Sequence, residues 1–334
     1  MKAFSALVKA RTMEFVRDKG SFYWNLLFPV ALVVGFAFAF SGPGDALFKV
    51  GVLGPGDPAL GFLKTPQTQF ITYDAAVPPA QVLSKLRLHK LDAVIDTTAK
   101  VFWINDQGKN AKILEILLTK QEGAAKYVRQ WVSGPPIRYV DWLVPGVIAM
   151  NVMFGCLWGV GYIIVRYRKN GVLKRLKATP VSPLQFLAAQ GLSRFLIVLA
   201  TSIVVYVGTD FFLHFRMQGS YFDLLFLTCL GILSMVALGL AFASRLRNEE
   251  LANGLLNLIL FPMMLFSGVF FSLEGTPQPL QMTAQIFPMT HLIQAARAIM
   301  LEGAGLAQVI PEVLFLTLFS ALCLGLAAWL FKWE

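Results

Sequence analysis

RYRKNGVLKRLKATPVSP, residues 166–183, holds six lysine and arginine residues and no acid, and it lies between two long apolar runs. Within it, Val172, Leu173 and Leu176 fall on one side of a helix, because side chains three and four positions apart are neighbours on a helical surface. The basic side chains project elsewhere. The pattern predicts a short helix near 171–178 with an apolar edge and a basic rim.

Helix-breaking residues flank this short helix on both sides. Asn170-Gly171 suits a helix start and Thr179-Pro180 a helix stop. Ser182 then suits an N-cap, with a proline at the first position of the next helix. A charged anchor needs only the charges, whereas a docking element for a cytoplasmic partner also needs the apolar edge and the breakers.

The composition of the whole chain indicates an integral membrane protein. Of its 334 residues, 56% are hydrophobic and only 14% are charged, and the mean hydropathy is +0.63, whereas soluble domains carry about 25% charged residues. Apolar runs close to the roughly 20 residues that cross a bilayer recur along the chain. The predicted fold is mainly α-helical, with six membrane-spanning helices. They lie near 21–41, 143–165, 190–213, 222–243, 251–271 and 311–331.

The formal net charge of +10 follows the predicted topology. Basic residues gather before the first span, between the second and third, after the fourth and after the last. Alternate short loops are therefore basic, as the positive-inside rule requires of cytoplasmic loops. The pattern places both termini in the cytoplasm and gives the charge a role that involves no nucleic acid.

The segment between the first and second spans has a different character. Residues 42–140 are polar and punctuated by proline and glycine, and they predict a small α/β domain. Strands are expected in FKVGVLGPGDP, TQFITYD, around residues 93–95 and in KVFWIND, and helices in PPAQVLSKLRLHKL and through NAKILEILLTKQEGAAKYVRQWV. By alternation of sides this domain is extracytoplasmic.

The other parts of the chain complete the predicted domain organisation. Residues 1–20 predict a cytoplasmic helix in the membrane interface. The five later spans occupy 141–334. Between the last two, a semi-apolar segment near 272–303 is broken by prolines, and we expect it to enter the membrane from the outer side as a re-entrant element covered by protein.

Polar residues inside the spans are costly against lipid and normally face protein or a cavity. Two span faces stand out for this reason, one in the fifth span and one in the second: Asn253, Asn257 and Phe261, and Asn151, Phe154 and Trp158. Asparagines and a Gly-x-x-x-Gly spacing also hold helices together, so helix packing is the competing interpretation. Arg194, near the cytoplasmic start of the third span, is expected to extend to the interface.

The sequence carries no catalytic or metal-binding pattern. It has no G-x-x-x-x-G-K-[ST] phosphate loop, no G-x-S-x-G and no H-E-x-x-H. Its three histidines match no metal-ligand spacing, and its three cysteines fall in apolar runs, so no disulfide framework is implied. We expect neither an enzyme nor a bound cofactor, and if ATP drives the function, a second polypeptide binds it.

Four passages together resemble the transmembrane subunit of an ABC-2 type ATP-binding-cassette exporter. In chain order they are KARTMEFVRDKGSF, then FKVGVLGPGD with LSKLRLHKLDAVID, then GVLKRLKATPVSPLQFLAAQ, then LFSGVFFSLEGTP with FPMTHLIQAARAIML. The resemblance covers nearly the whole chain, and the order and spacing of the passages are more specific than any one of them. The chain departs from the family at Tyr167-Arg168-Lys169, beside which members often carry an acidic pair.

The resemblance implies a complex of two membrane subunits, expected to be two copies of this chain, with two cytoplasmic ATPases that use ATP and Mg. It implies that the short helix is a coupling helix seated in a cleft of the ATPase. Val172, Leu173 and Leu176 would be buried in the partner, and Lys174 and Arg175 would lie at its rim.

The resemblance also implies a second ATPase contact, a pathway and a location. Arg247 and Glu249, in the next cytoplasmic turn, would make a lesser contact, although a solvated turn explains them equally well. The second and fifth spans would border the substrate pathway, in the inner membrane of a bacterium and in contact with its lipid. Whether the outer domain gates, recruits a periplasmic partner or stabilises the dimer stays open.

Two other classes of protein compete with this interpretation. A membrane-anchored sensor would use residues 42–140 to bind an external ligand, but it would not need a structured helix near 171–178. An ion-coupled secondary transporter usually shows paired inverted repeats and acidic residues within its spans, and the sequence shows neither.

Overall fold

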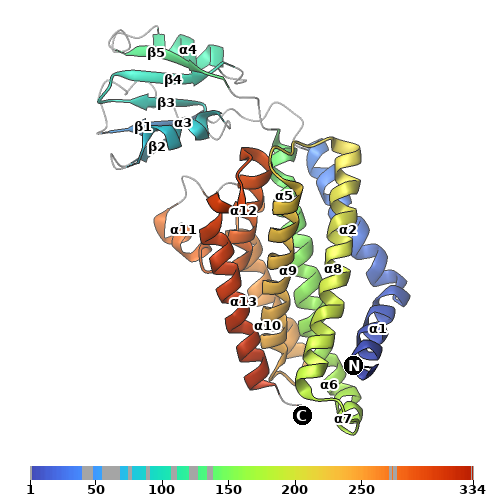
Figure 1. The fold of residues 1–334 in the computed structure, drawn as a ribbon. Coiled ribbons are helices and arrows are strands. Elements are labelled where there is room, and N and C mark those ends of the chain that lie inside the picture. The colour runs from blue at the N-terminus through green and yellow to red at the C-terminus, as the bar shows by residue number, and fades with distance from the viewer. Residues whose placement is uncertain are drawn as a thin grey trace. The chain divides into compact units, whose positions relative to one another are not determined.

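The computed structural model describes residues 2–39, 48–54, 68–73, 77–87, 91–106, 111–119, 127–133, 138–270, 273, 277–331 and 333. The chain divides into two compact units (Figure 1). A helical unit combines Met1–Ala37 with Val140–Glu334, and an α/β unit covers Phe38–Tyr139.

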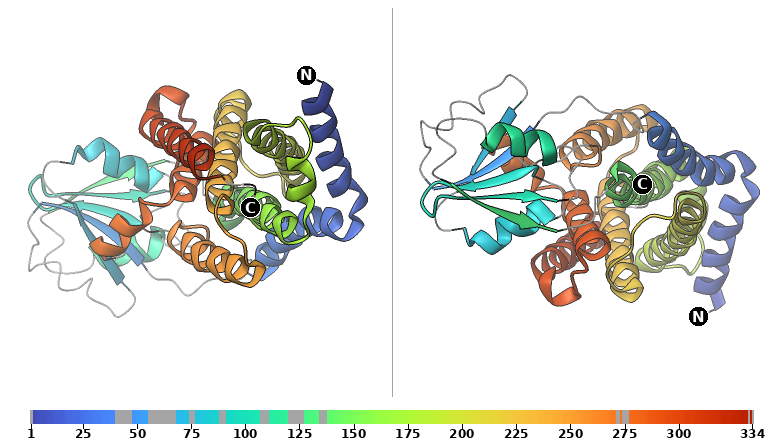
Figure 2. Two further views of the ribbon diagram at one scale, coloured as in Figure 1. Left: turned by 90° about the horizontal axis from the view of Figure 1, so that it is seen from below. Right: turned by 90° about the horizontal axis from the view of Figure 1, so that it is seen from above.

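The helical unit is a bundle of long helices joined by short turns (Figure 2). Its elements are α1 (Lys2–Arg17), α2 (Lys19–Ala39), α5 (Tyr139–Cys156), the π-helix η3 (Leu157–Tyr162), α6 (Ile163–Lys169), α7 (Val172–Lys177), α8 (Pro183–Leu213), α9 (Tyr221–Ala243), α10 (Glu249–Phe266), α11 (Gln278–Ala284), α12 (Pro288–Glu302), the short 3-10 turn η4 (Leu306–Gln308) and α13 (Ile310–Leu330).

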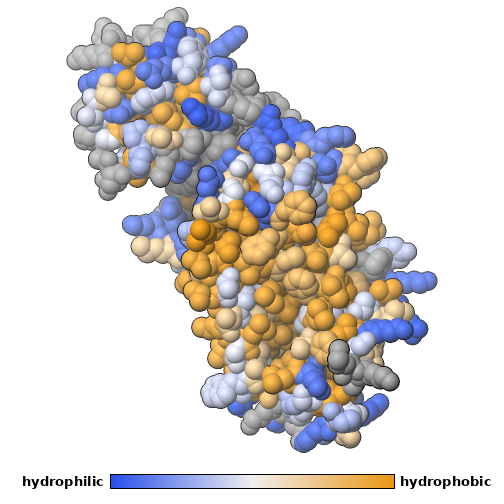
Figure 3. All heavy atoms as spheres, in the orientation of Figure 1, coloured by the Kyte–Doolittle hydropathy of each residue, from blue (hydrophilic) through white to orange (hydrophobic). Residues whose placement is uncertain are grey.

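Among the described residues, five helices are long and apolar enough to cross a membrane. They are Val140–Lys169, Pro183–Leu213, Tyr221–Ala243, Glu249–Phe266 and Ile310–Leu330. Each of the five spans predicted after residue 140 falls on one of them. The first predicted span falls on α2, a helix of 21 residues, except for residues 40–41, which lie outside the described residues. Figure 3 shows a broad band of hydrophobic side chains over the helical unit.

The continuous helix formed by α5, η3 and α6 is the core of the bundle. Its most apolar window is 72% buried, against 22% to 56% for the other four helices. Close approach to α9 occurs at glycines: a Cβ built on Gly239 would lie 3.3 Å from the Cys156 carbonyl oxygen. Small residues of this kind let membrane helices pack backbone to backbone.

Two helices, α11 and α12, occupy the described part of the segment 272–303. Arg297 of α12 donates to the carbonyl oxygens of Gly268 at 2.8 Å and Trp142 at 3.2 Å, and its guanidinium lies 3.5 Å from the centre of the Trp142 ring. These contacts fasten α12 to the residues after α10 and to the start of α5.

The α/β unit contains a five-stranded sheet in the order β2-β1-β3-β4-β5. The strands are β1 (Phe48–Leu53), β2 (Thr68–Tyr73), β3 (Ala93–Asp96), β4 (Val101–Asn105) and β5 (Val128–Val132), and only the β3–β4 pair is antiparallel. Helix α3 (Pro79–Arg87) contributes Val82 and Leu86 to one hydrophobic cluster, and α4 (Ala111–Thr119) contributes Ala111 and Leu114 to a second cluster.

One sequence-based expectation in this unit was wrong. Residues 110–132 were expected to be helical throughout, but α4 ends at Thr119 and Val128–Val132 form β5, parallel to β4. Valine and tryptophan favour a strand, and β5 satisfies the backbone groups along one edge of β4. The helical spacing of the apolar residues before Thr119 did not reveal this pairing.

Candidate functional site

Helix α7 lies in the turn between α6 and α8, and its ends are defined by the flanking residues. Gly171 adopts φ +70°, a left-handed conformation that favours glycine, and the helix follows it directly. At the start of α8, the Ser182 side chain accepts from the Gln185 backbone N–H at 3.2 Å, and the Gln185 side chain accepts from the Ser182 backbone N–H at 3.1 Å. The predicted N-cap is confirmed as a capping box.

The side chains of α7 divide differently from the sequence prediction. Leu173 is fully buried within the chain itself, whereas Val172 and Leu176 are half-buried. Lys174 and Arg175 are exposed. Leu173, which the sequence predicted to face a partner, packs against the chain's own bundle.

Arg168 and Lys169, which precede α7, connect the turn that contains α7 to the turn between α9 and α10. The Arg168 guanidinium donates to the Ala243 carbonyl oxygen at 3.0 Å, to the Ser244 carbonyl oxygen at 3.1 Å and to the Leu246 carbonyl oxygen. Arg168 thereby satisfies carbonyl groups that the end of α9 leaves without helical partners. The Lys169 ammonium lies 2.8 Å from a carboxylate oxygen of Glu249.

These bonds make the two turns one connected surface, which we call the α7 surface: residues 171–178 together with 245–250. Arg247 is exposed on it, which fits a solvated turn and a contact with a partner equally well. Glu249 is half-buried and its carboxylate is paired with Lys169. Within the single chain, Glu249 therefore helps to hold the two turns together.

The candidate pathway residues of the fifth span lie on one outward face of α10. Asn253 is exposed and Asn257 is half-buried, and the Asn257 side-chain amide donates to the Asn253 side-chain oxygen at 3.2 Å. Phe261 follows on the same face with 56% of its surface exposed. Large apolar neighbours on α10 are also exposed, namely Leu251, Leu258 and Leu265. A polar pair inside an apolar helix thus lies on a surface that the single chain leaves uncovered.

The candidate residues of the second span separate into two groups. Asn151 is buried, and its amide donates to the Ser202 hydroxyl at 3.5 Å, so it joins α5 to α8 in the way the helix-packing interpretation expects. Phe154 and Trp158 are half-buried and line a polar cavity of about 460 Å³ beside α1 and α8.

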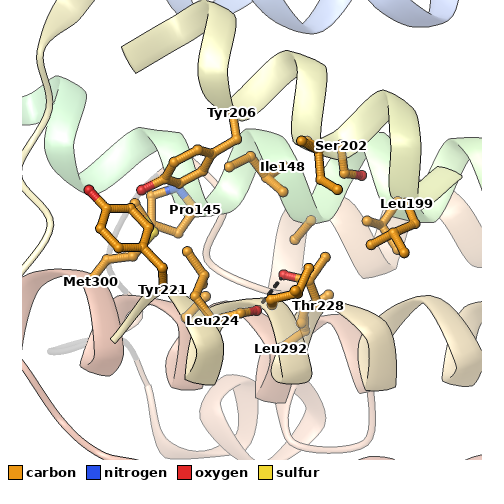
Figure 4. Close-up of a pocket in the computed structure, with 15 residues that line it drawn as sticks. Pro145, Ile148, Leu199, Ser202, Tyr206, Tyr221, Leu224, Thr228, Leu292 and Met300 are labelled. Atoms are coloured by element: carbon orange, nitrogen blue, oxygen red, sulfur yellow. Dashed lines mark hydrogen bonds between the residues drawn. The ribbon is translucent and has the colours of Figure 1, made fainter. Parts of the chain in front are cut away.

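Sequence reasoning missed an apolar cavity of about 270 Å³ between α5, α8, α9 and α12 (Figure 4). Tyr206 and Tyr221 lie at one end of it, and Leu199 lies toward the other. Its walls are almost wholly aliphatic and aromatic, with Ser202 and Thr228 as the hydroxyl-bearing residues besides the tyrosines. Thr228 donates its hydroxyl to the Leu224 carbonyl oxygen at 2.7 Å, which leaves the cavity suited to an apolar group.

Comparisons with known proteins all point to one family of membrane transport proteins. A model of the ABC-2 type transporter family matches residues 97–301, more than half of the chain. The chain is 27% identical over 178 residues to the inner membrane transport permease YhhJ of Escherichia coli (strain K12), covering 52% of this chain and 47% of that protein. It is 22% identical over 205 residues to the probable multidrug ABC transporter permease YbhS of the same organism, covering 60% of this chain and 53% of YbhS.

A third relative comes from a different bacterium. The linearmycin resistance permease protein LnrN of Bacillus subtilis (strain 168) is 25% identical over 166 residues, covering 50% of this chain and 43% of LnrN. The chain spans about half the length of the curated relatives it matches. The bundle of membrane-length helices and the family match together define a multi-pass membrane protein. The chain belongs to the ABC-2 type transporter family.

Proposed function

We propose that the chain is the membrane subunit of an ATP-driven exporter, and that a separate cytoplasmic ATPase docks on the α7 surface. The single observation that supports this proposal is the arrangement of side chains on the α7 surface. A short helix with exposed lysine and arginine side chains and two half-exposed aliphatic ones is held rigidly by Arg168 and by the Lys169–Glu249 ion pair. A rigid surface transmits a push from a partner better than a loose turn does.

The topology of the proposal follows from charge and alternation. With α2 as a sixth span, the basic turns fall on one side of the membrane, which the positive-inside rule makes the cytoplasm. Both termini then lie in the cytoplasm and the α/β unit lies outside. The name of YhhJ places that relative in an inner membrane, and we propose the same bacterial membrane for this chain.

A second copy of the chain completes the pathway in this proposal. The outward face of α10 combines the Asn253–Asn257 pair with Phe261 and exposed leucines. Asparagine amides are costly against lipid, and a partner helix at this face would cover them or enclose a path beside them. We therefore assign Asn253, Asn257 and Phe261 to the interface and pathway, and Asn151 to packing within the chain.

The proposal is tested by purifying the tagged chain from its native membrane in mild detergent and identifying what accompanies it. A P-loop ATPase in a one-to-one ratio, lost when Lys174 and Arg175 are both changed to glutamate, is the expected result. As a matched control, charge reversal of Lys85 and Arg87, which belong to the α/β unit, should leave the ATPase bound. Purification of the chain with no ATPase, from a membrane that contains one, would contradict the proposal.

A further inference from the structure

The polar cavity beside α1 differs from the apolar one because a charged side chain projects into it from inside the bundle. The cavity, of about 460 Å³, is bounded by α1, by the π-helix η3 with its neighbours α5 and α6, and by α8. Arg194 of α8 lines it with only 7% of its surface exposed. The guanidinium, expected to extend to the membrane interface, is enclosed by protein beside α1.

The Arg194 guanidinium makes no hydrogen bond or ion pair with any residue that the structure describes. It lies 5.1 Å from the centre of the Phe15 ring. A buried cation is stable only when it is paired and hydrogen-bonded. The guanidinium therefore lines a space that an anion can fill.

The backbone of η3 makes room for this arginine. A Cβ built on Gly159 would lie 1.9 Å from the Arg194 Cζ, so no side chain other than glycine fits there with the guanidinium in place. Gly159 lies inside a π-helix, and π-helical turns in α-helices are frequent at functional sites. The position of the Arg194 guanidinium therefore depends on α8, which carries the side chain, and on η3, where Gly159 leaves room for it.

The other charges facing the cavity do not neutralise Arg194 by contact. The Glu14 carboxylate accepts from Arg11 at 3.0 Å and from the Tyr167 hydroxyl. Asp18 and Arg166 also line the cavity, and both are exposed to solvent. Three cations and two carboxylates therefore face the space, and the buried charge among them is positive.

Two further features define the ligand. The Gln190 side-chain oxygen is buried and accepts no hydrogen bond in the described part of the chain, so it can accept from a ligand hydroxyl. Apolar side chains also line the wall, with Phe154, Trp158 and Ile197 beside Phe15. The chemistry that fits is an anionic group next to a hydroxyl, at the end of an apolar body.

We infer that this cavity binds an amphipathic molecule whose headgroup carries a phosphate-type anion and a hydroxyl, with Arg194 as its principal cation. The inference rests on the proposed function for its orientation, in which the cavity lies in the cytoplasmic half of the membrane, where such a molecule enters from the inner leaflet. It names the class of ligand that an exporter of this build takes up.

The test is native mass spectrometry of the delipidated full chain, purified with whatever subunits accompany it. It is titrated with dioleoyl phosphatidylglycerol, with the uncharged dioleoylglycerol and with inorganic phosphate. Wild-type chain should bind the anionic lipid about tenfold more tightly than the uncharged one, the factor expected of a charge-assisted hydrogen bond. Arg194→Gln should lose that preference, and Arg194→Lys should keep part of it.

A second pair of variants keeps the result interpretable if Arg194→Gln does not fold. Gly159→Ala displaces the guanidinium and should abolish the preference, whereas Gly208→Ala, on α8 with nothing within 4 Å of its added Cβ, should retain it. Equal binding of both lipids by wild-type chain, or a preference unchanged in Arg194→Gln and Gly159→Ala, would overturn the inference. So would inorganic phosphate binding as tightly as the lipid, because the site would then take a free anion. The readout needs no ATPase, so its failure would leave the proposed function untouched.

Discussion

Alanine substitutions at Leu173 and Leu176 should have opposite consequences, although the two residues lie on one six-residue helix. Leu173 is fully buried in the chain, and replacing a buried leucine with alanine costs about 2–5 kcal/mol of stability. The thermal midpoint of the purified subunit should therefore fall by roughly 4–20 °C. Leu176 is half-buried, so Leu176→Ala should change that midpoint little.

Binding to the ATPase should show the reverse order. Completing the burial of a half-buried leucine stabilises an interface by about 1 kcal/mol, half the value for full burial, so Leu176→Ala should weaken ATPase binding roughly fivefold. Surviving folded Leu173→Ala protein should bind with nearly wild-type affinity. The assays are thermal unfolding and titration of the ATPase onto nanodisc-embedded subunit. An unchanged midpoint with weakened binding for Leu173→Ala would refute the reasoning, because it would mean that Leu173 reaches the partner.

Three other consequences follow from the structure. Lys169→Glu and Glu249→Lys should each separate the two turns and so lower the ATP hydrolysis that the membrane subunit stimulates. The double exchange should restore that stimulated hydrolysis. Additive losses in the double variant would argue against the ion pair. Phe261→Cys should form a disulfide-linked dimer on oxidation in membranes. Phe222→Cys should not, although Phe222 on α9 is 83% exposed. Equal cross-linking of the two variants would contradict the α10 interface. Gly219→Ala would place a Cβ 2.4 Å from a backbone oxygen of α12 and should destabilise the unit by about 1–3 kcal/mol, seen as a lower thermal midpoint.

Much of the helical unit was predictable because span length and hydropathy are strong local signals. The five spans after residue 140 and the capping box at Ser182 follow from runs of apolar residues and from helix-breaking residues. The strand Val128–Val132 was not predictable in this way, since its existence depends on pairing with β4, a contact that apolar spacing does not record.

The candidate site was only partly predictable for a related reason. The sequence identifies a helix with an apolar edge, but not which edge residue turns inward, and Leu173 does so because of how α6 and α8 approach each other. Likewise, the hydrogen bond from Asn151 to Ser202 and the enclosure of Arg194 arise from two helices packing together. The one available signal for Arg194 was the Gly-x-x-x-Gly spacing on the facing helix, whose second glycine, Gly159, makes room for the guanidinium.

The central claim, that this membrane subunit is driven through the α7 surface, is tested most directly by ATP hydrolysis in proteoliposomes that contain the chain and its co-purified ATPase. The account predicts that wild-type subunit changes the hydrolysis rate of the ATPase and that Leu176→Asp with Arg175→Glu abolishes this change while the subunit remains folded. A hydrolysis rate that is the same with wild-type subunit, with the variant and with no membrane subunit would contradict it.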